Sequence, residues 1–295
     1  MSFRKCGFIR NIMCTFYRNA VDGQAGVMYI DHATEFITIY SFLKLNYDHT
    51  GSGTFECYNV VKTIVISTVF TRNKGRDGGG ISVKESGDLF IFNSQFIRNR
   101  AEYRGEAIII VKSRSVRCFS NTFVGNILLS KNAGFGSCFI IISVPFTSIS
   151  NCLVIKNKCK NFQAAIIIED FQNISIFSCD FRQNEGGVLS FEKGRNTYLQ
   201  KCTFFHNIGK AIGAVQIKKC EFVLETSINF VNNEFELSAG CASIENTILV
   251  FKINITFMSN KGSQGGGVHV NEITNIWINN VRFLTNKGID GGGMY

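Results

Sequence analysis

Three residues in the second half of the sequence have the chemistry that acid–base catalysis requires. Asp180, Glu185 and His206 lie in two successive copies of a repeat, so stacking of the copies could bring them close together. Enzymes that cleave polysaccharides use carboxylate pairs of this kind to donate and accept protons. Because nothing around these residues marks a cleft, we expect a solvated outer surface and no catalytic residue. A carbohydrate-active enzyme, a polysaccharide lyase or glycoside hydrolase, is the alternative.

Basic residues recur at two fixed places in the same repeat, immediately before and immediately after an asparagine. The chain carries 31 Lys and Arg against 22 Asp and Glu, a net charge of +9. Stacked repeats would align these cations into ridges with a spacing of ~4.8 Å, and such ridges attract acidic glycans and other polyanions. Solubility and protection of strand edges explain the same cations equally well. The candidate binding residues are Arg18, Arg72, Lys74, Arg98, Arg100, Lys156 and Lys158, and the pattern continues at Lys261 and Lys287.

The sequence contains no motif that is typical of binding a metal, a cofactor or a nucleic acid. It has no Cys-x-x-Cys pair, and its four histidines are far apart, which excludes a zinc finger or ribbon. We therefore expect no metal site and no cofactor. Outward aromatic residues are too few to interleave with the cations and stack on bases, so we expect no nucleic-acid partner.

These residues belong to a repeat of about 27 residues that extends along almost the whole chain. Its signature is Phe-x-x-Asn, followed by a glycine-rich stretch and a short alternating run such as that at 78–83. The phenylalanines of the clear copies are Phe16, Phe70, Phe96, Phe123, Phe181, Phe204, Phe230, Phe257 and Phe283, and Leu43 and Val154 begin two degenerate copies. Regular self-similarity at this period indicates a solenoid.

Alternation with a period of two in runs of three to five residues predicts strands, and no long stretch carries a helical period. Each repeat is therefore about three short strands separated by turns, and one repeat alone cannot bury its apolar face. We predict an all-β, right-handed parallel β-helix of about eleven coils, forming a single domain over residues 1–295. The longest departures from the regular spacing follow Asn126, where residues 127–134 are extra, and Asn184.

The repeat also predicts which side chains stack inside the coil. The phenylalanines should form one interior column and the residues two positions before them a second column. The asparagines should form a third, because Asn tolerates a left-handed backbone and its amide can bond neighbouring turns. Four of the eleven cysteines, Cys14, Cys152, Cys179 and Cys202, fall in the second column. There we expect core packing rather than disulfides, since parallel side chains hold their Cβ atoms too far apart.

Phe-x-x-Asn alternating with Gly-Gly-[Ala/Gly/Val]-[Ile/Val] resembles the repeats of polymorphic outer-membrane proteins, a family of surface adhesins and autotransporter passengers. The resemblance extends from Phe16 to Met294. It implies the right-handed β-helix of pectin-lyase-like proteins. It also implies a non-enzymatic, adhesin-like binding scaffold at the cell surface, with contacts through outward side chains and the variable turn from Ile127 to Gly134.

The two ends of the sequence both fall within a repeat, at Met1 and at Tyr295. Solenoids normally carry polar caps, so we expect a fragment of a longer surface or extracellular protein. A complete protein that associates end to end, and a structural or degenerate fragment without a partner, are alternatives. The N-terminus lacks the apolar core of a secretory signal. No apolar run approaches the ~18–20 residues of a membrane-spanning helix.

Overall fold

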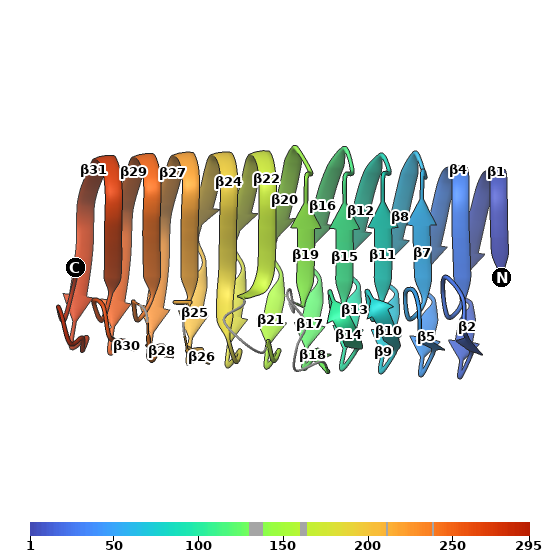
Figure 1. Cartoon of the computed structure of the whole chain (residues 1–295), viewed down its shortest axis with the longest axis horizontal. Helices are drawn as coiled ribbons and strands as arrows, with labels where there is room; N and C mark the ends of the chain where they lie inside the picture. The colour runs from blue at the N-terminus through green and yellow to red at the C-terminus, as the bar shows by residue number, and fades with distance from the viewer. Residues whose placement is uncertain (130–137, 160–163, 211, 238) are drawn as a thin grey trace. The chain divides into compact units, whose positions relative to one another are not determined.

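The computed structural model describes residues 1–129, 138–159, 164–210, 212–237 and 239–295. All regular structure in these residues is β-strand, and parallel strands stack coil upon coil into a β-solenoid of about ten turns. The predicted all-β parallel solenoid is therefore confirmed. The chain divides into two compact units, Met1–Thr147 and Ser148–Tyr295, which Figure 1 shows in blue to green and in green to red.

In the first unit each coil contains up to four strands. The last of these is a short segment in the glycine-rich turn, where the sequence predicted only a turn. These short strands pair with one another in a separate small sheet. The strands are β1 (Ser2–Ile12), β2 (Thr15–Tyr17), β3 (Ala20–Val21), β4 (Met28–Ile39), β5 (Phe42–Lys44), β6 (Tyr47–Asp48), β7 (Phe55–Tyr58), β8 (Lys62–Ile66), β9 (Val69–Thr71), β10 (Lys74–Asp77), β11 (Ile81–Lys84), β12 (Asp88–Phe92), β13 (Gln95–Ile97), β14 (Arg100–Arg104), β15 (Ile108–Val111), β16 (Ser115–Phe119), β17 (Thr122–Val124), β18 (Ile127–Leu128) and β19 (Phe139–Ile142).

In the second unit several of these strands merge into segments of 14 to 17 residues. The strand β20 (Phe146–Ser150) includes the division between the units. The others are β21 (Leu153–Ile155), β22 (Ala164–Phe177), β23 (Asp180–Arg182), β24 (Gly187–Gln200), β25 (Thr203–Phe205), β26 (Ile208–Gly209), β27 (Val215–Val231), β28 (Glu234–Phe235), β29 (Ala242–Met258), β30 (Lys261–Gly262) and β31 (Val268–Leu284).

The repeated phenylalanines form an interior ladder in each unit, as the sequence predicts. Strand register places Phe70, Phe96 and Phe123 directly over one another, and the first two rings stack with centroids 4.7 Å apart and planes 1° apart. In the second unit the centroids of Phe204 and Phe230 are also 4.7 Å apart. This separation equals the strand spacing, so the rings stack without any change in the distance between coils.

The repeated asparagines form a second ladder, whose amides are buried from Asn46 to Asn260. The Asn99 side chain donates to the Phe70 carbonyl at 2.9 Å and to Asn126 Oδ1 at 3.2 Å. Its own Oδ1 accepts from both the backbone N–H and the side chain of Asn73, at 3.0 and 3.1 Å. The same bonds recur from Asn184 onward in the second unit. The predicted amide ladder is confirmed.

The left-handed residue of each corner is the one before the asparagine, not the asparagine itself. In all eleven copies this residue has φ between +51° and +62°. Two further columns of left-handed residues mark the other two corners, for example His32 and Ser67. The expectation that the asparagine itself adopts this conformation was therefore wrong. The turn one residue earlier rotates the amide inward, where it caps neighbouring coils.

The column two residues before the phenylalanine uses hydroxyls and thiols as hydrogen-bonding groups. Ser94 Oγ donates to the Phe92 carbonyl at 2.9 Å and accepts the Thr68 N–H at 3.2 Å. Cys179 occupies the equivalent position, and its Sγ makes the corresponding contacts with Phe177 and Cys152 at 3.4 and 3.5 Å. None of the eleven cysteines forms a disulfide. Core packing is confirmed for Cys152, Cys179 and Cys202. Their thiols occupy a column that holds hydroxyl side chains in some coils and apolar side chains in others.

Ionisable side chains also lie inside the coils, where charge is costly. Lys252 and Glu225 form an ion pair on adjacent coils of the second unit, and their side chains are 1% and 0% exposed. In the first unit Glu106 is fully buried and neither carboxyl oxygen has a hydrogen-bond partner. Burial raises the pKa of Glu106 to about 8.

Replacing Asn99 with Ala should lower the free energy of unfolding by roughly 3–5 kcal/mol. The substitution leaves the Asn73 N–H and amide and the Phe70 carbonyl without a partner, and each buried unpaired group costs about 1–3 kcal/mol. Urea denaturation followed by circular dichroism measures the loss. Gln95→Ala, an exposed change on the same coil, is the control, and equal stability of the two variants would contradict the structural role of the ladder.

Glu106→Gln should reduce the loss of stability with rising pH. The pKa of Glu106 is about 8 in the folded chain and near its ordinary 4.5 when unfolded. The folded chain therefore keeps the Glu106 proton up to about pH 8, whereas the unfolded chain releases it above about pH 4.5, so stability falls as pH rises between these two values. The wild-type chain should lose up to about 1.4 kcal/mol more per pH unit than the variant across this interval. Unfolding midpoints at several pH values test this, with exposed Glu236→Gln as control.

Candidate anion-binding site

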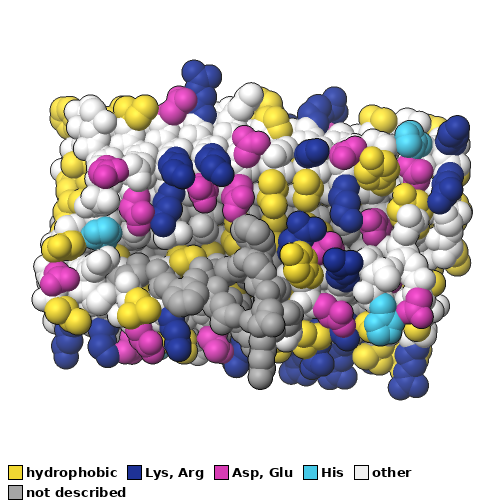
Figure 2. Space-filling view, in the orientation of Figure 1, with side chains coloured by type: hydrophobic (Ala, Val, Ile, Leu, Met, Phe, Trp, Pro, Cys, Tyr) yellow, Lys and Arg dark blue, Asp and Glu magenta, His cyan; other side chains and the backbone are white. Residues whose placement is uncertain are grey.

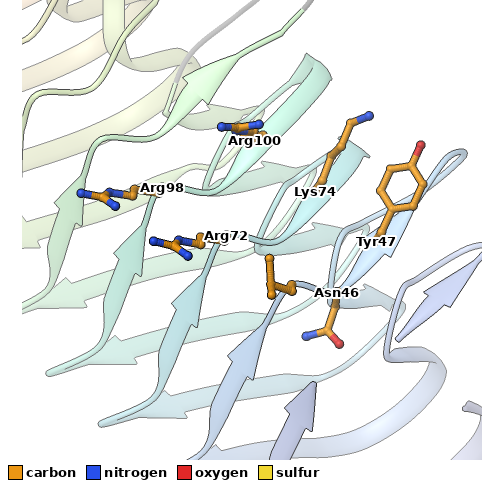
Figure 3. A pocket seen from close by; sticks show the side chains of 7 residues that line it. Asn46, Tyr47, Arg72, Lys74, Arg98 and Arg100 are labelled. Atoms are coloured by element: carbon orange, nitrogen blue, oxygen red, sulfur yellow. The ribbon is translucent and has the colours of Figure 1, made fainter. Parts of the chain in front are cut away.

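The basic residues predicted to bind anions come together in the first unit around one corner of the coil. Arg72 and Arg98 are the left-handed corner residues of successive coils, with φ of +54° and +53°. Lys74 and Arg100 follow the ladder asparagines and are in direct register between β10 and β14. Figure 3 shows Arg72 and Arg98 extending in the same direction, with Lys74 and Arg100 on the strands that follow. The four cations thus form a two-by-two array.

The array lines an open depression of about 510 Å³. The remaining lining residues, Leu45, Asn46 and Tyr47, come from the coil before it. Lys74 Nζ lies 4.7 Å from the centroid of the Tyr47 ring, which gives the depression an aromatic wall. In Figure 2, Lys and Arg side chains gather along the lower edge of the view.

Only one of the four cations has an acidic partner among the described residues. Lys74 Nζ lies 2.6 Å from Glu102 Oε1, and this hydrogen bond raises the lysine pKa above its ordinary value. The exposed guanidinium groups of Arg72, Arg98 and Arg100 form no ion pair within the part of the chain that the structure describes. Three uncompensated cations on adjacent coils repel one another, and a bound anion would remove that repulsion.

The predicted ridges do not continue along the chain. Arg18 occupies the same corner position, but Leu45 follows it in the next coil and the guanidinium lies 5.0 Å from the Tyr17 ring. In the second unit Lys158 pairs with Glu185 at 2.9 Å and Lys261 with Glu234. Lys156 is exposed at its corner, where Gln183 takes the equivalent position in the next coil. The array is therefore local to two coils.

Each residue of the enzyme alternative contacts a different partner. Asp180 pairs with Arg182, and Glu185 pairs with Lys158. His206 Nε2 lies 3.1 Å from the Asn232 amide and lines a separate depression of about 510 Å³. Neither carboxylate lines that depression. Within the described residues, no group of three His, Cys, Asp or Glu side chains is placed to hold a metal ion.

Two features of the surface were missed from sequence. The first is Tyr47, which directly follows a ladder asparagine and is in register with Lys74 on the next coil. Aligning the residues that follow each asparagine would have shown this aromatic neighbour. Aromatic rings do lie among cations on the outer surface: the Phe90 ring centroid is 5.9 Å from Lys62 and 5.6 Å from Arg117. The premise that such rings are too few was wrong, while the expectation of no nucleic-acid partner stays a prediction. Of the predicted variable turn, Ser130 to Gly134 lie outside the described residues.

Comparison of the chain with protein-family models, with curated proteins and with solved structures gives no match. The described residues contain no helix of the length and apolar character needed to cross a bilayer. The site therefore has to be interpreted from its own geometry.

The arginines of the array should be dispensable for folding. A left-handed conformation costs a residue with a β-carbon roughly 1–2 kcal/mol, and Asn tolerates it better than Arg. Arg72→Asn with Arg98→Asn should leave the free energy of unfolding unchanged or raise it by about 1 kcal/mol. Arg104→Asn, which removes two 3.1 Å bonds to Asp77, should lower it. A comparable loss in both variants would show that the arginines support the coil.

Proposed function

We propose that this chain is a non-enzymatic binding scaffold whose first unit holds an acidic glycan against the Arg72–Lys74–Arg98–Arg100 array. The observation that carries the proposal is the set of three arginines that have no acidic partner among the described residues and lie beside one aromatic wall. Two of them occupy left-handed corners where Asn or Gly would be less strained. Cations gathered on two adjacent coils without neutralising partners create a local positive potential that attracts an anionic ligand.

The spacing of the array suits a linear polyanion. Successive cations along the coil axis are one strand spacing apart, ~4.8 Å, and the two columns stand on either side of the ladder asparagines. A sulfated or carboxylated polysaccharide presents anionic groups at regular intervals and could meet both columns. Guanidinium groups form paired hydrogen bonds with such anions. The depression is open, so recognition rests on charge and spacing.

The proposal includes a cell-surface position and a relation to the polymorphic outer-membrane protein repeats. It is supported by the Phe-x-x-Asn and Gly-Gly pattern and by the stacked parallel coils that such repeats are expected to form. An adhesin-like protein would use its outward side chains for contact, as proposed for the array. End-to-end self-association of the chain also stays a prediction.

Binding to immobilised heparin tests the proposed function. Two surface cations contribute about 1 kcal/mol each to an anionic partner, so Arg72→Asn with Arg98→Asn should weaken binding roughly 30-fold at low salt. Affinity of the wild-type chain should fall as ionic strength rises. Arg18→Asn removes the same charge from the same corner of an isolated position and should cost much less.

If Arg18→Asn weakened heparin binding equally, binding would depend on the overall positive charge and not on the array. Failure to bind heparin or polygalacturonate would leave the scaffold without a ligand, as in the fragment alternative. Monitoring polygalacturonate for unsaturated products in the same experiment tests the enzyme alternative, because product formation would contradict a non-enzymatic role.

A further inference from the structure

The second unit carries an outer surface without charged side chains. On four neighbouring strands, β24, β27, β29 and β31, three outward positions of each strand align in register. We name this surface the uncharged face. Its residues are Asn196, Tyr198 and Gln200; Phe222, Leu224 and Thr226; Leu249, Phe251 and Ile253; and Asn275, Trp277 and Asn279.

Aromatic rings form a continuous row through the centre of the uncharged face. The ring centroids of Tyr198 and Phe222 are 5.7 Å apart, and those of Phe222 and Phe251 are 5.8 Å apart. Phe251 continues to Trp277 at 6.3 Å, with the two planes 15° apart. Trp277 is 65% exposed. These side chains alternate with buried residues such as Val223 and Val250, so they are not part of the core.

Neutral hydrogen-bonding groups surround the aromatic row. Asn196 and Gln200 flank Tyr198 on its strand, and Asn275 and Asn279 flank Trp277. The Asn196 amide donates to Asn173 on the preceding coil at 2.8 Å. At one edge of the face Arg195 and Glu221 pair with each other at 3.2 Å. At the other edge Lys201, which follows Gln200, lies 5.2 Å from the centroid of the Phe177 ring. The face therefore offers amide donors and acceptors beside apolar rings.

The fold does not require an uncharged surface at this place. On the corresponding strands of the first unit, outward positions hold Glu35, Lys62, Asp88 and Arg117. Charged side chains are therefore tolerated there, and their absence from four successive coils is specific to the second unit. An exposed apolar and aromatic patch of this kind marks an interaction surface.

The chemistry and the regularity of the face define the ligand. An uncharged surface gains nothing from a charged partner, whereas aromatic rings pack against the C–H faces of sugars and amides bond their hydroxyls. The depressions lined by Arg72, by His206 and by Glu236 include no residue of the face. A surface that repeats coil by coil fits a polymer that repeats unit by unit.

We propose that the uncharged face binds a neutral hexose polymer along the row from Tyr198 to Trp277. This site is separate from the cationic array and does not depend on it. Binding would cover the ring of Trp277, which is the single tryptophan of the chain. Its fluorescence therefore reports directly on occupation of the face.

The test titrates the whole chain with laminarin oligosaccharides, maltoheptaose and mannohexaose while following Trp277 emission and its quenching by acrylamide. At least one of these should shift the emission to shorter wavelength and reduce quenching at millimolar concentration. Phe251→Ser, and separately Asn275→Ala with Asn279→Ala, should weaken the effect at least tenfold. The second variant leaves the rings in place. Phe119→Ser, an exposed aromatic in the first unit, is the control.

The remaining outcomes each overturn the proposal. Protection by none of the three polymers would exclude a neutral hexose ligand. A shift that depends on protein concentration without sugar would identify a second copy of the chain as the occupant. Protection by heparin that disappears in Arg72→Asn with Arg98→Asn would assign the effect to the cationic array. Those arginine changes should leave the response to neutral sugar intact, so failure of one site is distinguishable from failure of the other.

Discussion

The structure depends on one buried hydrogen-bond arrangement, the asparagine ladder at the corner of each coil. A parallel solenoid must turn its backbone sharply several times per coil, and each turn removes peptide groups from the strand ladder. The asparagine amide supplies the missing partners, since it bonds the phenylalanine carbonyl of the previous coil and the amide of the next. Its side chain thus extends the backbone hydrogen bonding through a place where strands cannot pair.

The ladder also explains how the surface acquires its chemistry. The residue before each asparagine takes a left-handed conformation and points outward, so the corner can display almost any side chain at a modest cost in strain. Arg, Lys, His, Asn, Ser and Thr all occur there among the described residues. The inward asparagine and the outward corner residue are adjacent in sequence but carry separate functions. Binding chemistry can therefore change from coil to coil without disturbing the core.

The interior accommodates ionisable side chains in more than one way. Glu225 and Lys252 occupy the column that holds Leu199 and Ile278 in the neighbouring coils. Each is buried, and each finds the other one coil away. An unpaired ion would cost several kcal/mol there. Glu106 has no such partner, and its raised pKa shows how the chain meets the same constraint by keeping a proton.

The sequence alone determined the fold class, the interior phenylalanine column and the amide ladder, because a solenoid converts linear spacing into vertical stacking. It could also place the cations in their columns, since columns follow from the repeat. It could not show that Glu102 neutralises Lys74, because Glu102 lies outside the column of Lys74, which is in register with Arg100. Nor could it show the uncharged face, whose rings come from two outward columns that meet only when four coils are in register. Those contacts depend on distances across coils, which only the tertiary structure decides.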